Sequence, residues 1–372
     1  MNIQYPDYDN SILSVTNSFL KAYGAKHSHA TLPILDALLT KRYRNVILLV
    51  MDGMGCNVLK THLPADSFLR RHIISDVSSV YPCTTTAAIN TFQSGDSPHE
   101  HGWIGWSCYF KEVDKCIDLF LNRESGTDQP ACEENQPYKY LNYTTIASKI
   151  RQATDNKVKV CAVSPFAEYF ADTLEGICET VEKLCADSER KFIYAYHYEP
   201  DLLMHDIGIT ASAVKEMMQN YNARLEQLAK QLADTLLIIT ADHGMTDVTT
   251  KCIEDYPELN AMLKRHICVE PRCCSFYIKE EYKKAFPLAF EKAFEGKFKL
   301  YTHDAFLSSG LTGGGAAHPK VDEFVGDYMA VAISDIALWY KDTKGEYHDF
   351  KAAHAGLTTE EMRVPLIAVS CK

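Results

Sequence analysis

The sequence predicts an α/β fold, with a doubly wound and mostly parallel sheet flanked by helices and a small inserted cap. Three short, continuous apolar runs occur at 45–51, 192–196 and 236–240, and such runs are typical of strands buried on both faces of a parallel sheet. Between them apolar residues recur at helical spacing, most clearly over 210–233. Strands that alternate with helices indicate βαβ units and therefore a doubly wound sheet.

Two segments of the 372-residue chain fit this alternation poorly. Residues 108–142 are polar, aromatic and rich in cysteine and proline, so we expect them to form an excursion over the sheet. Residues 249–312 begin as a loop and then contain a strand pattern and a helix pattern of their own, which indicates an inserted cap. The main, catalytic core is then expected over 1–248 and 313–372.

Composition and charge restrict the class of protein. The net charge is −11 and Lys and Arg form no long cluster, which disfavours binding to nucleic acid polymers. A small anionic substrate remains compatible, because bound divalent metals reverse the field locally. The sequence does not indicate an oligomeric state.

The cysteines and the N-terminal sequence indicate the compartment. Thirteen cysteines are spread along the chain without a CxxC pair, which is unlike a disulfide scaffold or a zinc finger. The first residues lack the pattern of a signal peptide, and no apolar run approaches the length needed to span a bilayer. We therefore expect a protein of the reducing cytoplasm that does not enter a membrane.

Acidic residues and histidines follow the three apolar runs. Asp52, Asp201 and the pair Asp242-His243 each come soon after one of them. Each could alone be a turn residue, since Asp-Gly after a strand is a turn signal. In a doubly wound sheet, however, ligands bind beyond the carboxyl ends of the strands, and all four residues fall there.

Two further histidines, His205 and His354, complete a set of three carboxylates and three imidazoles. These are ligands that zinc and manganese accept. Two metals with three protein ligands each would use all six and keep positions open for a substrate, as a catalytic site requires.

A nucleophile candidate lies in the segment Tyr81-Pro82-Cys83-Thr84-Thr85-Thr86, which precedes a short helical pattern ended by Gly95. One interpretation is that a threonine only caps this helix. The other is that the helix N-terminus binds a phosphoryl group while a metal ionises the hydroxyl.

Taken in order, five motifs resemble the type I phosphodiesterase/nucleotide pyrophosphatase branch of the alkaline phosphatase superfamily. They are Asp52, Tyr81-Pro82-Cys83-Thr84-Thr85, Glu199-Pro200-Asp201-Leu202-Leu203-Met204-His205, Ala241-Asp242-His243-Gly244-Met245 and His354-Ala355-Gly356. The resemblance covers about 44–107, 190–247 and 350–370. The sulfatase branch is disfavoured, because its Cys- or Ser-x-Pro-x-Arg pattern is absent.

The resemblance implies a role for each motif residue. One metal would be held by Asp201, His205 and His354, and a second by Asp52, Asp242 and His243. The nucleophile would be Thr85, and a shift of one residue would select Thr84 or Thr86 instead.

One position departs from the family pattern. The family usually has an asparagine shortly after the nucleophile helix, where its amide binds a phosphoryl oxygen, and here Trp106 stands in its place. An indole N–H or the hydroxyl of Ser107 could donate to the substrate instead. We also expect Arg272, in the cap, to form a surface salt bridge, with contact to a substrate phosphate as the alternative.

The implied function is hydrolysis of phosphodiester or pyrophosphate bonds in a small substrate, with a nucleotide as one candidate, through a phospho-threonine intermediate. Two divalent metals are expected, zinc first and manganese as the alternative. Other reactions on the same scaffold stay open: phosphomonoesterase, phosphonate hydrolase and phosphotransferase. The non-enzymatic alternative is a catalytically silent protein that binds metal and a phosphorylated ligand.

Overall fold

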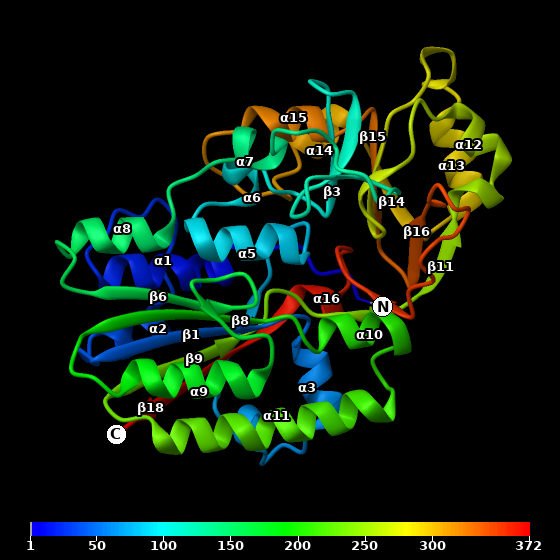
Figure 1. The fold of residues 1–372 in the computed structure, drawn as a ribbon. Helices are drawn as coiled ribbons and strands as arrows, with labels where there is room; N and C mark the ends of the chain where they lie inside the picture. Colours follow the sequence, from blue (N-terminus) through cyan, green and yellow to red (C-terminus); the bar gives the residue numbers. More distant parts are fainter. Residues whose placement is uncertain (1) are drawn as a thin grey trace.

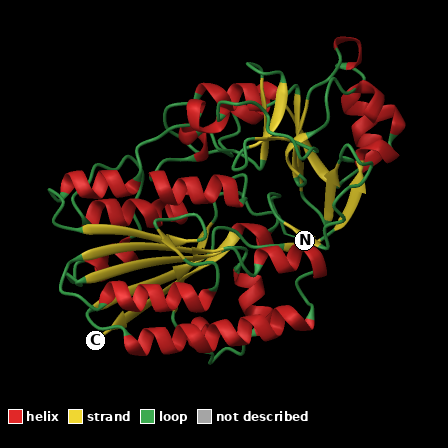
Figure 2. Cartoon of the chain, viewed as in Figure 1, coloured by secondary structure: helices red, strands yellow, loops and turns green. Residues whose placement is uncertain are grey.

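A seven-stranded mixed sheet forms the centre of the larger part of the protein in this computed structural model, which describes residues 2–372 (Figures 1 and 2). The strand order is β2-β18-β9-β1-β8-β6-β7, and only β18 runs antiparallel to its neighbours. The strands are β1 Asn45–Met51, β2 Ile73–Ser78, β6 Lys159–Ser164, β7 Tyr169–Phe170, β8 Lys191–His197, β9 Thr235–Thr240 and β18 Arg363–Cys371.

The three apolar runs form β1, β8 and β9, side by side in the middle of this sheet, as the sequence predicts. Every residue of β1 and β9 is buried, because helices cover both faces of the sheet. In Figure 1, α1, α5 and α8 lie on one face and α3, α9 and α11 on the other. The doubly wound α/β prediction is therefore confirmed.

The helices of this part include α11, which matches the predicted helix over 210–233. Their bounds are α1 Ile12–Ala22, α2 Pro33–Leu39, α3 Cys56–His62, α4 Phe68–Arg71, α5 Thr85–Ser94, α8 Ile146–Ala153, α9 Leu174–Cys185, α10 Asp201–Ile207, α11 Ser212–Gln231 and α16 Thr359–Met362, with a 3₁₀ turn η1 at Tyr8–Asn10. Within residues 2–372, every helix is too short or too polar to cross a membrane.

A second, antiparallel sheet of seven strands lies beside the first part, towards the upper right of Figure 2. Its order is β14-β15-β13-β12-β3-β4-β5. The strands are β3 Ser107–Phe110, β4 Lys115–Asp118, β5 Arg123–Glu124, β12 Cys268–Glu270, β13 Cys273–Phe276, β14 Phe298–Thr302 and β15 Tyr328–Ala332.

The bounds of this sheet differ from those expected for the excursion and the cap. Strand β3 begins one residue before the segment 108–142 and pairs with β12 of the segment 249–312 through Ser107 and Val269, so both segments belong to one sheet. Strand β15 joins the same sheet from beyond residue 312. These pairings connect residues far apart in the chain, and local sequence patterns do not reveal them.

Short helices and strand pairs complete the second part and its connections. The helices are α6 Pro98–His101, α7 Gln136–Tyr140, α12 Pro257–Met262, α13 Phe286–Phe294, α14 His303–Leu307 and α15 Pro319–Phe324, with 3₁₀ turns η2 Ile253–Asp255 and η3 Glu280–Tyr282. Two further strand pairs are β10 Thr246–Asp247 with β17 Ala352–Ala353, and β11 Thr249–Cys252 with β16 Ile336–Trp339.

Candidate active site

The register of the central strands brings four of the predicted ligands together. Residue 51 of β1 lies opposite residue 197 of β8, and residue 50 lies opposite residue 240 of β9, so the three strands end at the same level. Asp52 therefore lies next to Asp242 and His243, and the backbone N–H of Gly53 donates to Asp242 Oδ1 at 3.1 Å. A Cβ on Gly53 would lie 2.9 Å from the Cβ of Asp201, so the close approach of these strand ends requires glycine.

Asp52, Asp242 and His243 form one candidate metal triad, whose ligand atoms lie within 4.8 Å of one another. His243 Nε2 is 3.3 Å from Asp52 Oδ1 and 3.2 Å from Asp242 Oδ2. All three side chains are buried, which keeps competing water away from them.

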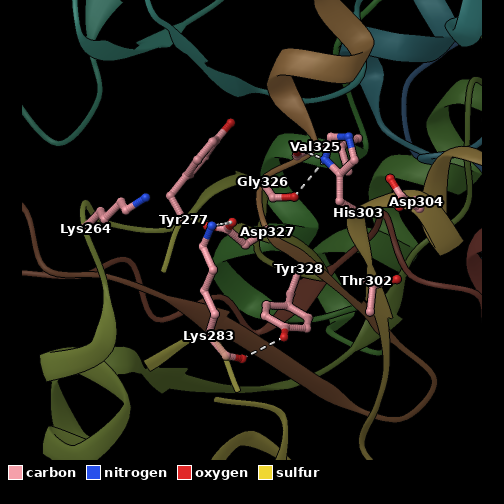
Figure 3. A pocket seen from close by; sticks show the side chains of 10 residues that line it. All are labelled: Lys264, Tyr277, Lys283, Thr302, His303, Asp304, Val325, Gly326, Asp327 and Tyr328. Carbon is pink, nitrogen blue, oxygen red and sulfur yellow. Dashed lines mark hydrogen bonds and ion pairs between the residues drawn. The ribbon is translucent and has the colours of Figure 1, made fainter. Parts of the chain in front are cut away.

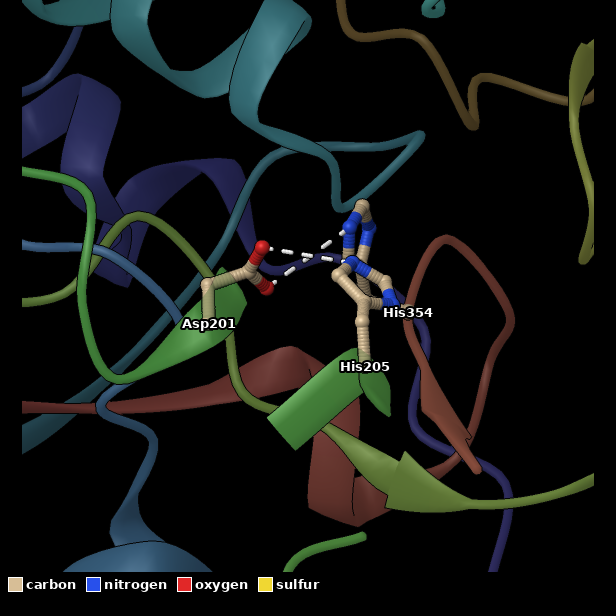
Figure 4. Close-up of side chains that lie close together, drawn as sticks. All are labelled: Asp201, His205 and His354. Carbon is tan, nitrogen blue, oxygen red and sulfur yellow. Dashed lines mark ion pairs between the residues drawn. The ribbon is translucent and has the colours of Figure 1, made fainter. Parts of the chain in front are cut away.

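Asp201, His205 and His354 form the second candidate triad (Figure 4). Asp201 and His205 share one face of α10 at a spacing of four residues, with His205 Nε2 3.2 Å from Asp201 Oδ2. His354 follows β17, whose pairing with β10 places its Nε2 3.8 Å from Asp201 Oδ1. The rings of His354 and His243 stack with centroids 3.8 Å apart, so the two triads are adjacent.

The three histidines are oriented in the same way. In each ring Nδ1 lies against a backbone carbonyl oxygen: Ala352 at 2.8 Å for His205, Gly244 at 2.9 Å for His243 and Cys83 at 3.2 Å for His354. An Nδ1–H that donates to a carbonyl leaves Nε2 as the unprotonated nitrogen. This outer hydrogen bond is the usual support of a histidine that binds a metal through Nε2.

The electrostatics of the two triads also fit bound cations. Burial, together with the charges of Asp242 and Asp201, raises the pKa of Asp52 well above its usual value. Burial lowers the pKa of His354 well below its usual value, so this ring is neutral as a ligand must be. Buried Asp242 Oδ2 and Asp201 Oδ1 each lack a hydrogen-bond partner among residues 2–372. A divalent cation in each triad would satisfy these oxygens and remove the repulsion among the carboxylates.

Of the three neighbouring threonines, Thr85 is the one that faces a triad. It is the first residue of α5, and its Oγ1 lies 3.3 and 3.4 Å from the carboxylate oxygens of Asp52 and 3.3 Å from His243 Nε2. The hydroxyl of Thr84 donates instead to Glu270 at 2.6 Å, and that of Thr86 is buried without a partner in the described part of the chain. The arrangement therefore sets one hydroxyl between a metal triad and a helix N-terminus.

The predicted substrate-binding residues differ in exposure. Trp106 is 37% exposed, whereas Ser107 has no exposed surface and its Oγ has no hydrogen-bond partner within residues 2–372. Ser107 lies within β3, where pairing on both sides of the strand encloses it, so it offers no surface to a substrate in this conformation. Trp106 is bound through its backbone N–H, which donates to Glu270.

The prediction of a surface salt bridge for Arg272 is wrong. Its guanidinium is fully buried and forms a bidentate ion pair with Glu361, at 2.6 and 2.7 Å. Glu361 in turn accepts the backbone N–H of Gly356 at 2.7 Å, two residues after the candidate ligand His354. Arg272 therefore supports the loop that carries a ligand.

Two residues at the site carry no signal in the sequence. The hydroxyl of Tyr196 donates to Asp52 Oδ2 at 2.5 Å, and the carboxylate of Glu270 lies against the turn before α5. Tyr196 is one aromatic residue within an apolar strand, and Glu270 reaches the site only through the pairing of β12 with β3. In the sequence, only the motif Glu199-Pro200-Asp201 marks the region after β8, and no local pattern marks β12.

A separate cavity of about 360 Å³ lies among residues of the second sheet and its helices, including Lys264, Lys283 and His303 (Figure 3). None of its lining residues belongs to either triad.

Comparisons with known proteins agree with the geometry. The model of the family "Type I phosphodiesterase / nucleotide pyrophosphatase" matches residues 46–355, whereas no curated protein matches the chain. Similar solved structures include ectonucleotide pyrophosphatase/phosphodiesterase 5 (ENPP5) from mouse, which is 16% identical over 87% of each chain with a TM-score of 0.62. Human ENPP5 is 15% identical over 87% of each chain, with a TM-score of 0.65.

Phosphonoacetate hydrolase from Sinorhizobium meliloti 1021, in complex with phosphonoformate, is similar to the same degree. It is 16% identical, with 88% of this chain and 90% of that chain covered and a TM-score of 0.63. At such identities the likeness establishes the alkaline phosphatase-like fold and not the substrate. The family itself rests on the sequence match, which runs over most of the chain from β1 to His354. On that ground the protein belongs to the type I phosphodiesterase/nucleotide pyrophosphatase family of hydrolases.

Proposed function

We propose that this family member is a two-metal phosphoesterase that hydrolyses phosphodiester or pyrophosphate bonds of a small substrate, with Thr85 as its nucleophile. The observation that carries the proposal is the position of the Thr85 hydroxyl, within 3.4 Å of both Asp52 and His243 at the start of α5. A hydroxyl that only capped the helix would have no reason to face two candidate ligands.

The residues divide the chemistry between them. Thr85 would attack phosphorus in line with the leaving oxygen and become a phospho-threonine, which water then hydrolyses. Divalent cations held by the two triads would supply the positive charge that ionises the hydroxyl and stabilises the leaving oxygen. The N-terminal turn of α5 adds backbone N–H groups and a positive potential towards the phosphoryl oxygens.

Zinc is the metal we propose, with manganese as the alternative. Imidazole suits zinc well, and each triad combines it with carboxylate oxygens in a three-ligand set that leaves positions open. The Nε2 atoms of all three histidines are left for the metal by the outer hydrogen bonds at Nδ1.

Two similar structures favour two versions of this chemistry. One structure is murine ENPP5 in an inactive threonine-to-alanine variant, in complex with AMP, which supports a threonine nucleophile and a nucleotide substrate. The other is phosphonoacetate hydrolase in complex with phosphonoacetate, which supports phosphonate hydrolysis as the second candidate. Both require the same two triads, so the substrate decides between them.

The test is an assay of Thr85→Ala beside the wild type, with bis-p-nitrophenyl phosphate, p-nitrophenyl phosphate and phosphonoacetate in zinc or in manganese. Thr86→Ala is the matched control, because the Thr86 hydroxyl makes no hydrogen bond to any of the residues that the structure describes. We expect Thr85→Ala to lose activity by at least about a thousandfold while its metal content is unchanged. Residual activity near that of the wild type would refute the role of Thr85.

A further inference from the structure

The carboxyl group of Glu270 is a buried acid that the proposed mechanism does not use. It is 3% exposed, and its Oε1 accepts two short hydrogen bonds, from the Thr84 hydroxyl at 2.6 Å and from the Trp106 backbone N–H at 2.7 Å. Its second oxygen, Oε2, accepts no hydrogen bond from residues 2–372. One oxygen of this acid is therefore free for a ligand or for water beside the nucleophile turn.

Glu270 cannot easily withdraw from this position. It closes β12 and pairs with Cys273 of β13, and Pro271 follows it in the turn between the two strands. The next residue, Arg272, is fully buried and donates to the carbonyl oxygens of Ser334 and Ile336 as well as to Glu361. The backbone of Glu270 is thus held on one side by strand pairing and on the other by the buried Arg272, which fixes the position of the carboxyl group.

The charge of Glu270 acts on the candidate active site and is not neutralised. Within residues 2–372, no Lys or Arg forms an ion pair with it. It interacts electrostatically with His243 and His205, one from each triad. Burial raises its pKa to about 7, so the group is ionised at pH 8.

The charge balance of the site gives this acid a consequence. Three aspartates and an ionised Thr85 match the four positive charges of two divalent cations, which leaves no excess charge to attract a dianion. Ionised Glu270 accepts a hydrogen bond from Thr84, the residue before the nucleophile, and adds one further negative charge there. A phosphate monoester carries close to two negative charges at pH 8, because its second pKa is about 6, whereas a diester carries one.

We propose that Glu270 determines specificity by disfavouring doubly charged phosphoryl groups, so that the enzyme selects singly charged diesters over monoesters. This inference rests on the proposed function, since it assumes that phosphorus is bound between the triads. Repulsion scales with the charge of the ligand. At an effective dielectric of about 20, one unit of like charge several ångströms away changes affinity on the order of tenfold.

The test compares Glu270→Gln with the wild type. Glutamine keeps an oxygen that can accept from Thr84 and Trp106, so the variant removes the charge and retains the contacts. Glu281→Gln, an exposed change of the same charge at the edge of the second part, is the matched control. The zinc-loaded proteins are titrated at pH 8 with inorganic phosphate, a dianion, and with dimethyl phosphate, a monoanion, by calorimetry.

We expect Glu270→Gln to bind phosphate more tightly, with the ratio of phosphate to dimethyl phosphate affinity raised about tenfold. The ratio of kcat/KM for p-nitrophenyl phosphate to that for bis-p-nitrophenyl phosphate should rise by a similar factor. Glu281→Gln should leave both ratios within about twofold of the wild type.

A ratio that stays constant in Glu270→Gln, even if both affinities fall together, would overturn the inference and assign Glu270 a structural role only. The binding experiment needs no turnover, so it separates the two proposals. If phosphate binds but no substrate is cleaved, the proposed function fails while the role of Glu270 is still decided by the ratio. If phosphate binds to neither protein, both proposals are refuted.

Discussion

The contribution of the buried ion pair between Arg272 and Glu361 to stability can be tested with the variant Arg272→Met. Methionine fills much of the volume of arginine but leaves the Glu361 carboxylate buried without its bidentate partner. The backbone carbonyl oxygens of Ser334 and Ile336 also lose their donors. Removing one partner of a buried ion pair typically costs about 3–5 kcal/mol, because an uncompensated charge remains in the interior.

This cost converts into a measurable change of melting temperature. A chain of 372 residues has an unfolding entropy of about 0.8 kcal/mol per degree, at roughly 2 cal/mol/K per residue. The expected decrease of Tm for Arg272→Met is therefore about 4–6 °C, measured by circular dichroism at a fixed scan rate with zinc in excess. The double variant Arg272→Met/Glu361→Met should recover part of the loss, since it removes both charges.

Metal binding supplies a second readout of the same change. Glu361 accepts the backbone N–H of Gly356 and both the N–H and the hydroxyl of Thr358, so it holds the loop that follows His354. We expect Arg272→Met to bind one zinc ion with normal affinity and the second, at the triad that contains His354, more weakly. A Tm within 1 °C of the wild type together with unchanged metal affinity would refute the reasoning, because an intact buried pair of this kind cannot be lost at no cost.

Three further predictions follow from burial and charge. Removing the metals with EDTA should lower Tm by about 10 °C, because each of two ligands present at a thousand times its Kd stabilises the folded state by about 4 kcal/mol; an unchanged Tm would contradict two occupied triads. Because burial raises the pKa of Glu270 from 4.5 to about 7, its contribution to stability is complete below pH 4.5 and lost as the pH rises to about 7. In metal-free protein, the Tm of Glu270→Gln minus that of the wild type should therefore be about 4 °C larger at pH 8 than at pH 4.5. A difference that does not depend on pH would contradict the raised pKa of Glu270. Ellman's reagent should label a single thiol quickly in the native protein, because Cys132 is partly exposed and the other twelve cysteines are buried, whereas all thirteen should react in denaturant.

The sequence predicts the central sheet and the six candidate ligands well, for a local physical reason. A strand buried on both faces has a continuous apolar run, and the residue that follows it stands at the carboxyl edge of a parallel sheet. Asp52 and Asp242 can therefore be located from their own neighbours in the chain. His354 is located only by the resemblance to the family, because the two-residue strand β17 before it carries no pattern.

The second sheet could be predicted only in part, because its pairings are not local. Its β13 strand and α13 helix lie where the sequence expects a strand and a helix of the cap. The partnership of β12 with β3 joins segments more than 150 residues apart, and β15 completes the sheet from outside the expected cap. The sequence predicts an ordinary surface salt bridge for Arg272, yet its partner Glu361 is buried with it and lies near the other end of the chain.

This division between local and non-local information also separates the chemistry of the site from its specificity. The metal ligands stand on strand ends and on α10, so a short motif marks each of them and the reaction class can be inferred from the sequence. Glu270 and Trp106 meet only because the second sheet pairs β12 with β3 beside the start of α5. Members of the family can therefore share all six candidate ligands and still differ in the charge that faces the substrate. For this chain the charge at position 270, rather than the motifs, is what we expect to decide between a diester and a monoester.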